Sequence, residues 1–156
     1  MSIARVLRDY LDDHEVQYEL VDHPATGDSM HAAAAAHVPG ECLAKAVLLE
    51  DDGGYLMAVL PSTRHVHLGL LHKQFERSVG LATEVEIGAL FADCDPGAMP
   101  PVGAAYGIDT IVDDTLTEQP DIYFEAGDHH TLVHLSGPAF NELMKEAGQG
   151  SFSVPA

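Results

Sequence analysis

Apolar side chains recur at helical spacing in some parts of the chain and in short runs in others, which predicts a mixture of helices and strands. Residues 2–14 have the helical spacing and are expected to form an amphipathic helix. Other helices are predicted over an alanine-rich run that Ser29 can cap, over residues 68–75, after a Thr83–Glu86 capping box, and from Ser136 to about residue 147. Strands are predicted at residues 16–21, 43–50, 55–60, 108–112, 122–125 and 131–135.

The order of these elements favours one class of fold. Strands 43–50 and 55–60 flank an Asp-Asp-Gly-Gly turn and should form a hairpin. Helices and strands do not alternate regularly and no G-x-G-x-x-G motif occurs, so a doubly wound nucleotide-binding fold is not expected. The prediction is a mixed α/β fold in which a mixed β-sheet forms a partly closed barrel surrounded by helices. Residues 1–150 should form one domain, followed by a C-terminal tail at 151–156, with fraying after Gly148.

Composition and charge narrow the setting. The chain of 156 residues has a formal net charge of −18, which argues against a broad electrostatic grip on nucleic acid. No apolar run reaches the length of a membrane span, and the acidic N-terminal segment does not resemble a signal peptide. Cys42 and Cys94 lie far apart without a C-x-x-C motif, so a reducing, cytoplasmic setting is expected, although Cys94 could still be a reactive thiol.

The acidic residues are unevenly spread. Between Asp52 and Glu76 there is no Asp or Glu, and this window contains three histidines together with Arg64 and Lys73, with Arg77 directly after it. If any surface of this protein meets a polyanion, this segment is the best candidate. A chance gap in a loop and helix is an equally good explanation.

One lysine stands in an apolar segment. Lys45 lies within the run CLAKAVLL at residues 42–49, although the chain has only seven Lys and Arg residues. If the strand is at a sheet edge, the lysine can extend its ammonium to water. Alternatively, the ammonium points into a pocket and holds an anionic or polarised group.

A loop rich in proline and glycine is the second unusual segment. Residues 95–107, DPGAMPPVGAAYG, restrict or free the backbone at closely spaced points, so the loop can present its amides and carbonyls to a ligand. Surface loops often have this composition too, so the loop alone is weak evidence. Ser62 is a further candidate, because at a strand end it could face a cleft or simply form a turn.

Histidines gather near the last predicted strand. His130 and His134 share one face if the strand begins at residue 130, and His129 precedes them. Imidazole is a common metal ligand, but no H-E-x-x-H or Cys/His spacing accompanies these residues, so no metal is expected. Surface or hydrogen-bonded core histidines are the plainer interpretation. No G-x-S-x-G motif marks an α/β-hydrolase triad.

Three of these features, taken together, resemble a known family. The strand lysine Lys45, the Gly-x-x-x-Pro segment from Gly97 to Pro101, and His130 after Gly127 are similar in order and spacing to the YbaK/EbsC-type aminoacyl-tRNA editing family. That family includes free-standing deacylases and the editing insertion of bacterial prolyl-tRNA synthetases. The resemblance runs from the His-Pro pair at residues 23–24 through LSGPAFNEL at residues 135–143.

The resemblance implies a fold, an activity and a set of site residues. It implies a barrel-like mixed sheet ringed by helices, and hydrolysis of the ester that joins a wrong amino acid to tRNA. The catalytic residues would be Lys45, Gly97, Pro101 and His130. The expected substrate-binding residues are Ser62, Arg64, Lys73, Arg77, Met99, Pro100, Val102 and Gly103. The loop reads GAMPPVG where many members have a Ser and a Phe, which bears on the amino-acid pocket, and the edited amino acid is not inherited from the family.

Ester hydrolysis explains a lysine at this place. Negative charge develops on the carbonyl oxygen, and Lys45 could stabilise it or bind a phosphate of the terminal adenosine. Loop amides from Gly97 to Val102 could supply further donors. Water would attack directly, with the vicinal ribose hydroxyl or a backbone carbonyl as its base. His130 would orient the ester or shape the pocket, and a role as general base is the lesser alternative. We therefore expect Lys45 to face a cleft near Gly97 and His130, bordered by residues 53–77.

The expected partners follow from the same hypothesis. The acceptor end of tRNA would bind through base stacking and a small channel of Arg64, Lys73 and Arg77, and a synthetase could hold the rest of the tRNA. No cofactor, metal, membrane or DNA is expected, and the chain should be a monomer or a weak homodimer. The alternatives are a non-catalytic module of the same fold that binds a small ligand or a partner, and a hydrolase of another acyl ester.

Overall fold

The computed structural model describes residues 3–24 and 29–156, and its elements follow the predicted order closely. The helices are α1 (Arg5–Asp13), α2 (Ser29–Ala35), α3 (Leu68–Phe75), α4 (Glu84–Leu90), α5 (Asp114–Thr117) and α6 (Gly137–Leu143), with 3-10 turns η1 (Gly40–Cys42) and η2 (Gly103–Tyr106). The strands are β1 (Glu19–Asp22), β2 (Leu43–Asp51), β3 (Gly54–Pro61), β4 (Arg64–Val66), β5 (Gly80–Leu81), β6 (Asp109–Asp113), β7 (Asp121–Glu125), β8 (Thr131–Ser136), β9 (Gly148–Gly150) and β10 (Ser153–Pro155).

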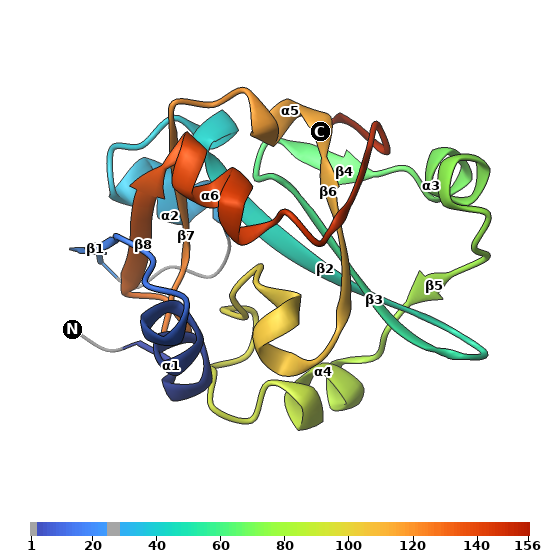
Figure 1. Ribbon diagram of the computed structural model, residues 1–156, viewed down its shortest axis with the longest axis horizontal. Helices are drawn as coiled ribbons and strands as arrows, with labels where there is room; N and C mark the ends of the chain where they lie inside the picture. The colour runs from blue at the N-terminus through green and yellow to red at the C-terminus, as the bar shows by residue number, and fades with distance from the viewer. Residues whose placement is uncertain (1–2, 25–28) are drawn as a thin grey trace.

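The main sheet is mixed and has eight strands, which confirms the predicted fold class (Figure 1). Its order is β1-β8-β7-β2-β3-β6-β9, with β5 paired to β2. The pairs β2–β7, β3–β6 and β6–β9 are parallel, and the others are antiparallel. Within the described ranges no ladder joins β1 to β9, so the sheet stays open. Helices flank the sheet: α1 and α6 lie on one side of it and α2 on the other (Figure 1).

Alternation along the strands divides the apolar side chains between the two faces of the sheet. One face carries the largest core, in which Ala44 and Phe124 pack with Leu7 and Leu11 of α1 and Phe140 of α6. The other face carries two smaller clusters. Near β8 the buried members are Ala32, Ala33, Leu43 and Leu132, and near β3 they include Leu49, Leu60, Leu71 and Phe152.

Local signals in the sequence account for several element ends. The β2–β3 hairpin pairs from Ala44 opposite Pro61 to Asp51 opposite Gly54, as predicted. At α4 the capping box is present in full, since Thr83 and Glu86 each bond the other's backbone amide. Helix α6 begins as predicted, with the Ser136 side chain accepting from the amide of Ala139, but ends earlier, at Leu143. The cap expected from Ser29 involves a side chain outside the described ones. No helix in the described ranges is long and apolar enough to cross a bilayer.

The expectation of a frayed C-terminus is wrong. Residues after Gly148 form β9, which lies parallel to β6, and β10, which pairs with β4. Buried Asp113 holds this segment, because its Oδ1 accepts from the amides of Phe152 and Ser153 at 3.1 and 3.2 Å. The side chain of Phe152 is completely buried. The C-terminal segment is therefore part of the folded domain.

We predict that Phe152→Ala lowers the free energy of unfolding by about 3–5 kcal/mol, because it leaves a cavity in a closed cluster. Urea denaturation measures the loss. Val85→Ala is the control, because Val85 is 83% exposed and should change stability little. Equal, small effects of the two substitutions would show that the C-terminal segment is not docked.

Candidate active site

Lys45 lies on an interior strand of the sheet. On one side β2 pairs with β3, where Lys45 is opposite Leu60, and on the other side it pairs with β7. The interpretation of an edge-strand lysine is therefore wrong. Leu43 is opposite Tyr123 and Ala44 opposite Phe124, so the next residues, Lys45 and Glu125, reach the same level of the sheet.

The same register places two chemically distinctive side chains on one face. In parallel strands, residues at the same level point to the same side of the sheet. Lys45 and Glu125 therefore share the face that carries Leu43 and Leu132 and that α2 covers. Lys45 is partly buried there, and Glu125 is only 4% exposed. A lysine and a buried acid thus lie on neighbouring strands at the carboxyl end of β7.

A tight turn follows Glu125 and leads into β8. Gly127 has φ +123°, and a Cβ on it would lie 3.0 Å from the Ala4 Cβ and 3.4 Å from the Cys94 Sγ, so only glycine fits. The Asp128 carboxylate braces the turn: one oxygen accepts from the amides of His130 and Thr131 at 3.0 and 2.9 Å, and the other accepts from the Thr131 hydroxyl. These bonds fix where the histidines point.

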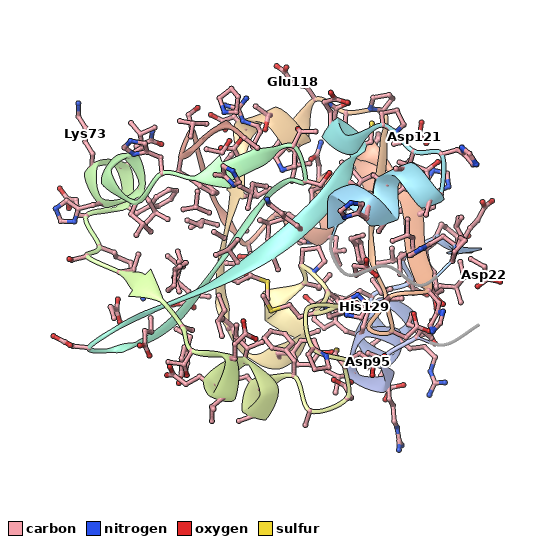
Figure 2. All side chains as sticks on the ribbon, turned by 180° about the vertical axis from the view of Figure 1, so that it is seen from behind. Asp22, Lys73, Asp95, Glu118, Asp121 and His129 are labelled. Carbon is pink, nitrogen blue, oxygen red and sulfur yellow. The ribbon has the colours of Figure 1, made fainter. Side chains whose placement is uncertain are left out.

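The proline-glycine loop is fastened to this turn. The amide of Asp95 donates to the carbonyl of Gly127 at 2.7 Å, and the imidazole Nε2 of His129 bonds the carbonyl of Pro96. Gly97 follows with φ +81°, and a Cβ there would lie 3.3 Å from the His129 ring. Asp95 and His129 are neighbours in the view of the side chains (Figure 2). The first residue of the Gly-x-x-x-Pro segment is therefore held by the β7–β8 turn.

The histidine at this loop is His129, whereas the sequence pointed to His130. His129 has φ +61°, in the left-handed region, and this conformation directs its ring to the loop. The side chain of His130 is exposed, and its carbonyl accepts from the amide of His23 at 2.8 Å. His130 thus shares the turn but not the contact with Pro96 and Gly97.

Buried polar atoms without partners concentrate around the turn. Within the described ranges, four buried side-chain nitrogen and oxygen atoms lack a hydrogen-bond partner, and they are both carboxylate oxygens of Glu125, Nδ1 of His129 and Nε2 of His23. Such atoms are rare in folded proteins and are a mark of functional sites. Burial raises the pKa of Glu125 to about 7, with Asp128 adding to the rise and His129 opposing it.

Glu125 and His129 were missed by sequence reasoning, although one signal was present. Glu125 is the only acid in the apolar run IYFEA, as Lys45 is the only cation in its own run. The criterion that selected the lysine would have selected the acid too. His129 carries no comparable signal, because its direction depends on the left-handed backbone at that residue.

The other predicted contacts have mixed positions. Ser62 is completely buried, and its hydroxyl donates to the carbonyl of Gly40, so it holds η1 to the end of β3. Arg64 donates to the Ser153 hydroxyl and carbonyl at 2.6 and 2.9 Å. Both side chains are thus engaged inside the fold rather than presented to a ligand.

The remaining predicted cations lie away from the turn. Arg77 forms an ion pair with Asp51 at 2.8 Å and approaches Asp109 at 3.9 Å, beside the far end of the hairpin. Lys73 is exposed on α3, at the opposite end of the molecule from His129 (Figure 2). The expectation that the segment up to Arg77 borders the mouth of the Lys45 site is therefore wrong for Lys73.

The rest of the loop faces the core. Pro100 and Pro101 are buried, Met99 is partly buried against the main core, and Val102 is 1% exposed. A Cβ on Gly103 would lie 2.2 Å from the Thr110 hydroxyl, so this glycine is required by packing. These residues brace the loop, and only its first part meets the turn.

A large cavity lies elsewhere in the protein. Its volume is about 1040 Å³, and its lining comes mainly from the ends of α1 and α6, from η2 and from β6. Among the predicted site residues, only Arg77, Val102 and Gly103 line it. Because Lys45, Gly97 and His129 are absent from its lining, we do not assign it to the candidate site. In the described ranges no three His, Cys, Asp or Glu side chains are grouped as metal ligands would be.

Comparisons with known proteins identify the group to which this architecture is similar. The family model of the aminoacyl-tRNA editing domain matches residues 23–143. The solved structure of the hypothetical protein APE2540 has a TM-score of 0.84 at 20% identity, and the match covers 96% of this chain and 100% of that one. A provisionally assigned trans-editing enzyme for prolyl-tRNA synthetase has a TM-score of 0.82 at 20% identity, with coverage of 97% and 96%.

A third structure contains this fold as one part of a longer chain. A provisionally assigned signal transduction protein from Marinobacter aquaeolei VT8 has a TM-score of 0.80 at 20% identity, and the match covers 98% of this chain but 31% of that one. At such identities the structural likeness establishes the fold. A search of curated proteins found no match.

We predict that Gly97→Ala destabilises the protein by about 1–2 kcal/mol, because a left-handed backbone is costly with a Cβ and the His129 ring occupies the space. Gly80→Ala is the matched control, since nothing lies within 4 Å of its Cβ position. Denaturation with urea compares the two variants. Equal stabilities would contradict the tight contact between the loop and the turn.

The buried carboxyl of Glu125 predicts a pH dependence of stability. Its pKa rises from 4.5 to about 7 on folding, so between these values the folded state binds more protons than the unfolded state. The stability of the wild type relative to Glu125→Gln should therefore be highest below about pH 4.5 and fall by about 3 kcal/mol as the pH rises past 7. Exposed Glu118→Gln should show no such trend, and a flat difference for both variants would contradict the burial of an ionisable acid.

Proposed function

The chain belongs to the aminoacyl-tRNA editing domain family, and on this basis we propose that it hydrolyses the ester between a wrongly attached amino acid and its tRNA. One observation carries the proposal. Lys45, on an interior strand, stands beside the end of β7, and the turn that leaves β7 holds the Gly97 loop. A cation and a loop with free amides are the two elements that ester hydrolysis needs near one place.

In the proposed reaction a water molecule attacks the acyl carbon. A bond forms from the water oxygen to that carbon, and the bond to the ribose oxygen breaks, which releases the amino acid and the free hydroxyl of the terminal adenosine. The vicinal ribose hydroxyl or a backbone carbonyl accepts the water's proton. Lys45 stabilises the negative charge on the carbonyl oxygen, or binds a phosphate of the terminal adenosine, and amides of the loop after Gly97 add donors.

The charge of the protein limits how it can meet tRNA. The chain has 25 acidic residues against seven Lys and Arg. Several of those cations are occupied, since Arg77 pairs with Asp51 and Lys145 pairs with Glu142. We infer that contact is confined to the acceptor end, because few phosphates can be neutralised. A synthetase would then hold the body of the tRNA.

A deacylation assay against a panel of charged tRNAs tests the function directly. Release of one or a few amino acids from tRNA would support editing. Equal hydrolysis of simple amino-acid esters would favour a general esterase, and no hydrolysis of either class would favour a non-catalytic binding module. The edited amino acid is an outcome of this assay, not a premise of the proposal.

We predict that Lys45→Ala lowers the rate of deacylation tenfold or more, which corresponds to about 1.4 kcal/mol of transition-state stabilisation. The circular dichroism spectrum should be unchanged. Lys145→Ala is the matched control, because Lys145 is an exposed lysine of the segment after α6 that pairs only with Glu142 among the described groups. Full activity of Lys45→Ala would remove the lysine from the mechanism.

A further inference from the structure

We propose that Glu125 and His129 form a positioning pair, in which the carboxyl group of Glu125 governs how the His129 imidazole holds the Pro96 carbonyl and hence how the Gly97 loop is set. The proposal deepens the proposed function, because this loop is the one we place at the reacting ester. Neither residue is proposed to touch the substrate. Both act through the position of the loop.

The contact between His129 and Pro96 defines the state of the ring. A carbonyl can only accept a hydrogen bond, so Nε2 of His129 carries the hydrogen that points to the Pro96 oxygen. The other ring nitrogen, Nδ1, is then the site at which a second proton binds. Nδ1 is buried and has no hydrogen-bond partner among the described residues. The charge of the ring therefore depends on nearby charges rather than on water.

Glu125 supplies such a charge from within the fold. Its carboxylate is buried with both oxygens unpaired, and the electrostatic effect of His129 opposes the burial that raises the Glu125 pKa. An ionised carboxylate favours a cationic ring, and a protonated carboxyl does not. Because the pKa of Glu125 is about 7, its charge changes near neutral pH. The interaction that fixes the ring changes with it.

The backbone keeps the ring in this place at a cost. The left-handed conformation of His129 is uncommon for a residue other than glycine. It is maintained by the Asp128 brace and by the bond from the Asp95 amide to the Gly127 carbonyl. A strained residue maintained from both sides, with its ring on a loop carbonyl, is expected where exact placement matters.

The ring is also in close contact with the loop. Its Cε1 lies 3.3 Å from the point where a Cβ on Gly97 would be, so the ring, the Pro96 carbonyl and Gly97 form one packed unit. A change in the ring therefore moves the peptide groups next to it. Those peptide groups are the donors that we propose to face the ester oxygen.

Other titratable groups surround the pair and must be separated from it. On the segments around it, these groups are Lys45 of β2, His23 after β1, His31 of α2, Cys94 and Asp95 before the loop, and Asp128 and His130 of the turn. Asp128 adds to the rise of the Glu125 pKa. Burial raises the pKa of Cys94 to about 12, far above neutral pH. A test must therefore compare variants of Glu125 itself.

Nuclear magnetic resonance provides a test that does not depend on activity. In the wild type, the backbone amide signals of Gly97 and Ala98 should titrate with a midpoint near pH 7, the pKa of Glu125. In Glu125→Gln this titration should disappear, because Gln mimics the protonated acid. In Glu118→Gln, a change of the same kind at an exposed site distant from His129, it should remain (Figure 2). His129→Gln should also abolish it.

Kinetics provide the second arm once a substrate is identified. Glu125→Gln should lower kcat about tenfold at pH 8, where the wild-type acid is ionised, with KM within about twofold. At pH 6 the variant and the wild type should converge, and Glu125→Asp should recover part of kcat at pH 8. A purely structural role would lower activity equally at both pH values.

The outcomes separate this proposal from the proposed function. Loop amides that titrate identically in the wild type and in Glu125→Gln would overturn the positioning pair, whatever the activity. If Glu125→Gln fails to fold, the same comparison with His129→Gln and Glu125→Asp decides. Loop titration that depends on Glu125, in a protein that hydrolyses no charged tRNA, would support the pair and contradict the editing reaction.

Discussion

The hydrogen bond from the amide of Asp95 to the carbonyl of Gly127 is the contact on which the rest of the site depends. It joins the loop before Gly97 to the turn between β7 and β8, two segments far apart in sequence. Gly127 allows the approach because it lacks a Cβ, and its backbone is in a region closed to most residues. With this contact in place, His129 reaches Pro96, and the loop lies near the end of β7, beside the strand of Lys45.

The site places stability in conflict with function. Glu125 is buried without a hydrogen-bond donor among the described residues, which destabilises its ionised form and hence the folded state at neutral pH. His129 has an unfavourable backbone conformation. Both costs fall on the same turn, while the surrounding strands form a closed apolar core. Such concentration of strain beside a site is typical of proteins in which placement of a few groups limits activity.

Elements with local signals could be predicted from the sequence, and elements that depend on distant contacts could not. The hairpin and the capping box at Thr83 were found because their determinants are adjacent in sequence. Strands β9 and β10 were missed because they depend on Asp113, which lies far away along the chain. For the site, Lys45 and Gly97 were named from pattern and resemblance. His129 was passed over for His130, because a single left-handed residue decides which ring meets the loop.

A structure with a non-hydrolysable analogue, an aminoacyl-adenosine in which an amide replaces the ester, tests the central claim most directly. The account predicts that the acyl carbonyl lies between the ammonium of Lys45 and the backbone amides after Gly97, with the His129 ring still on the Pro96 carbonyl. Binding in the large cavity between α1, α6 and β6, with no contact to Lys45 or the loop, would contradict it.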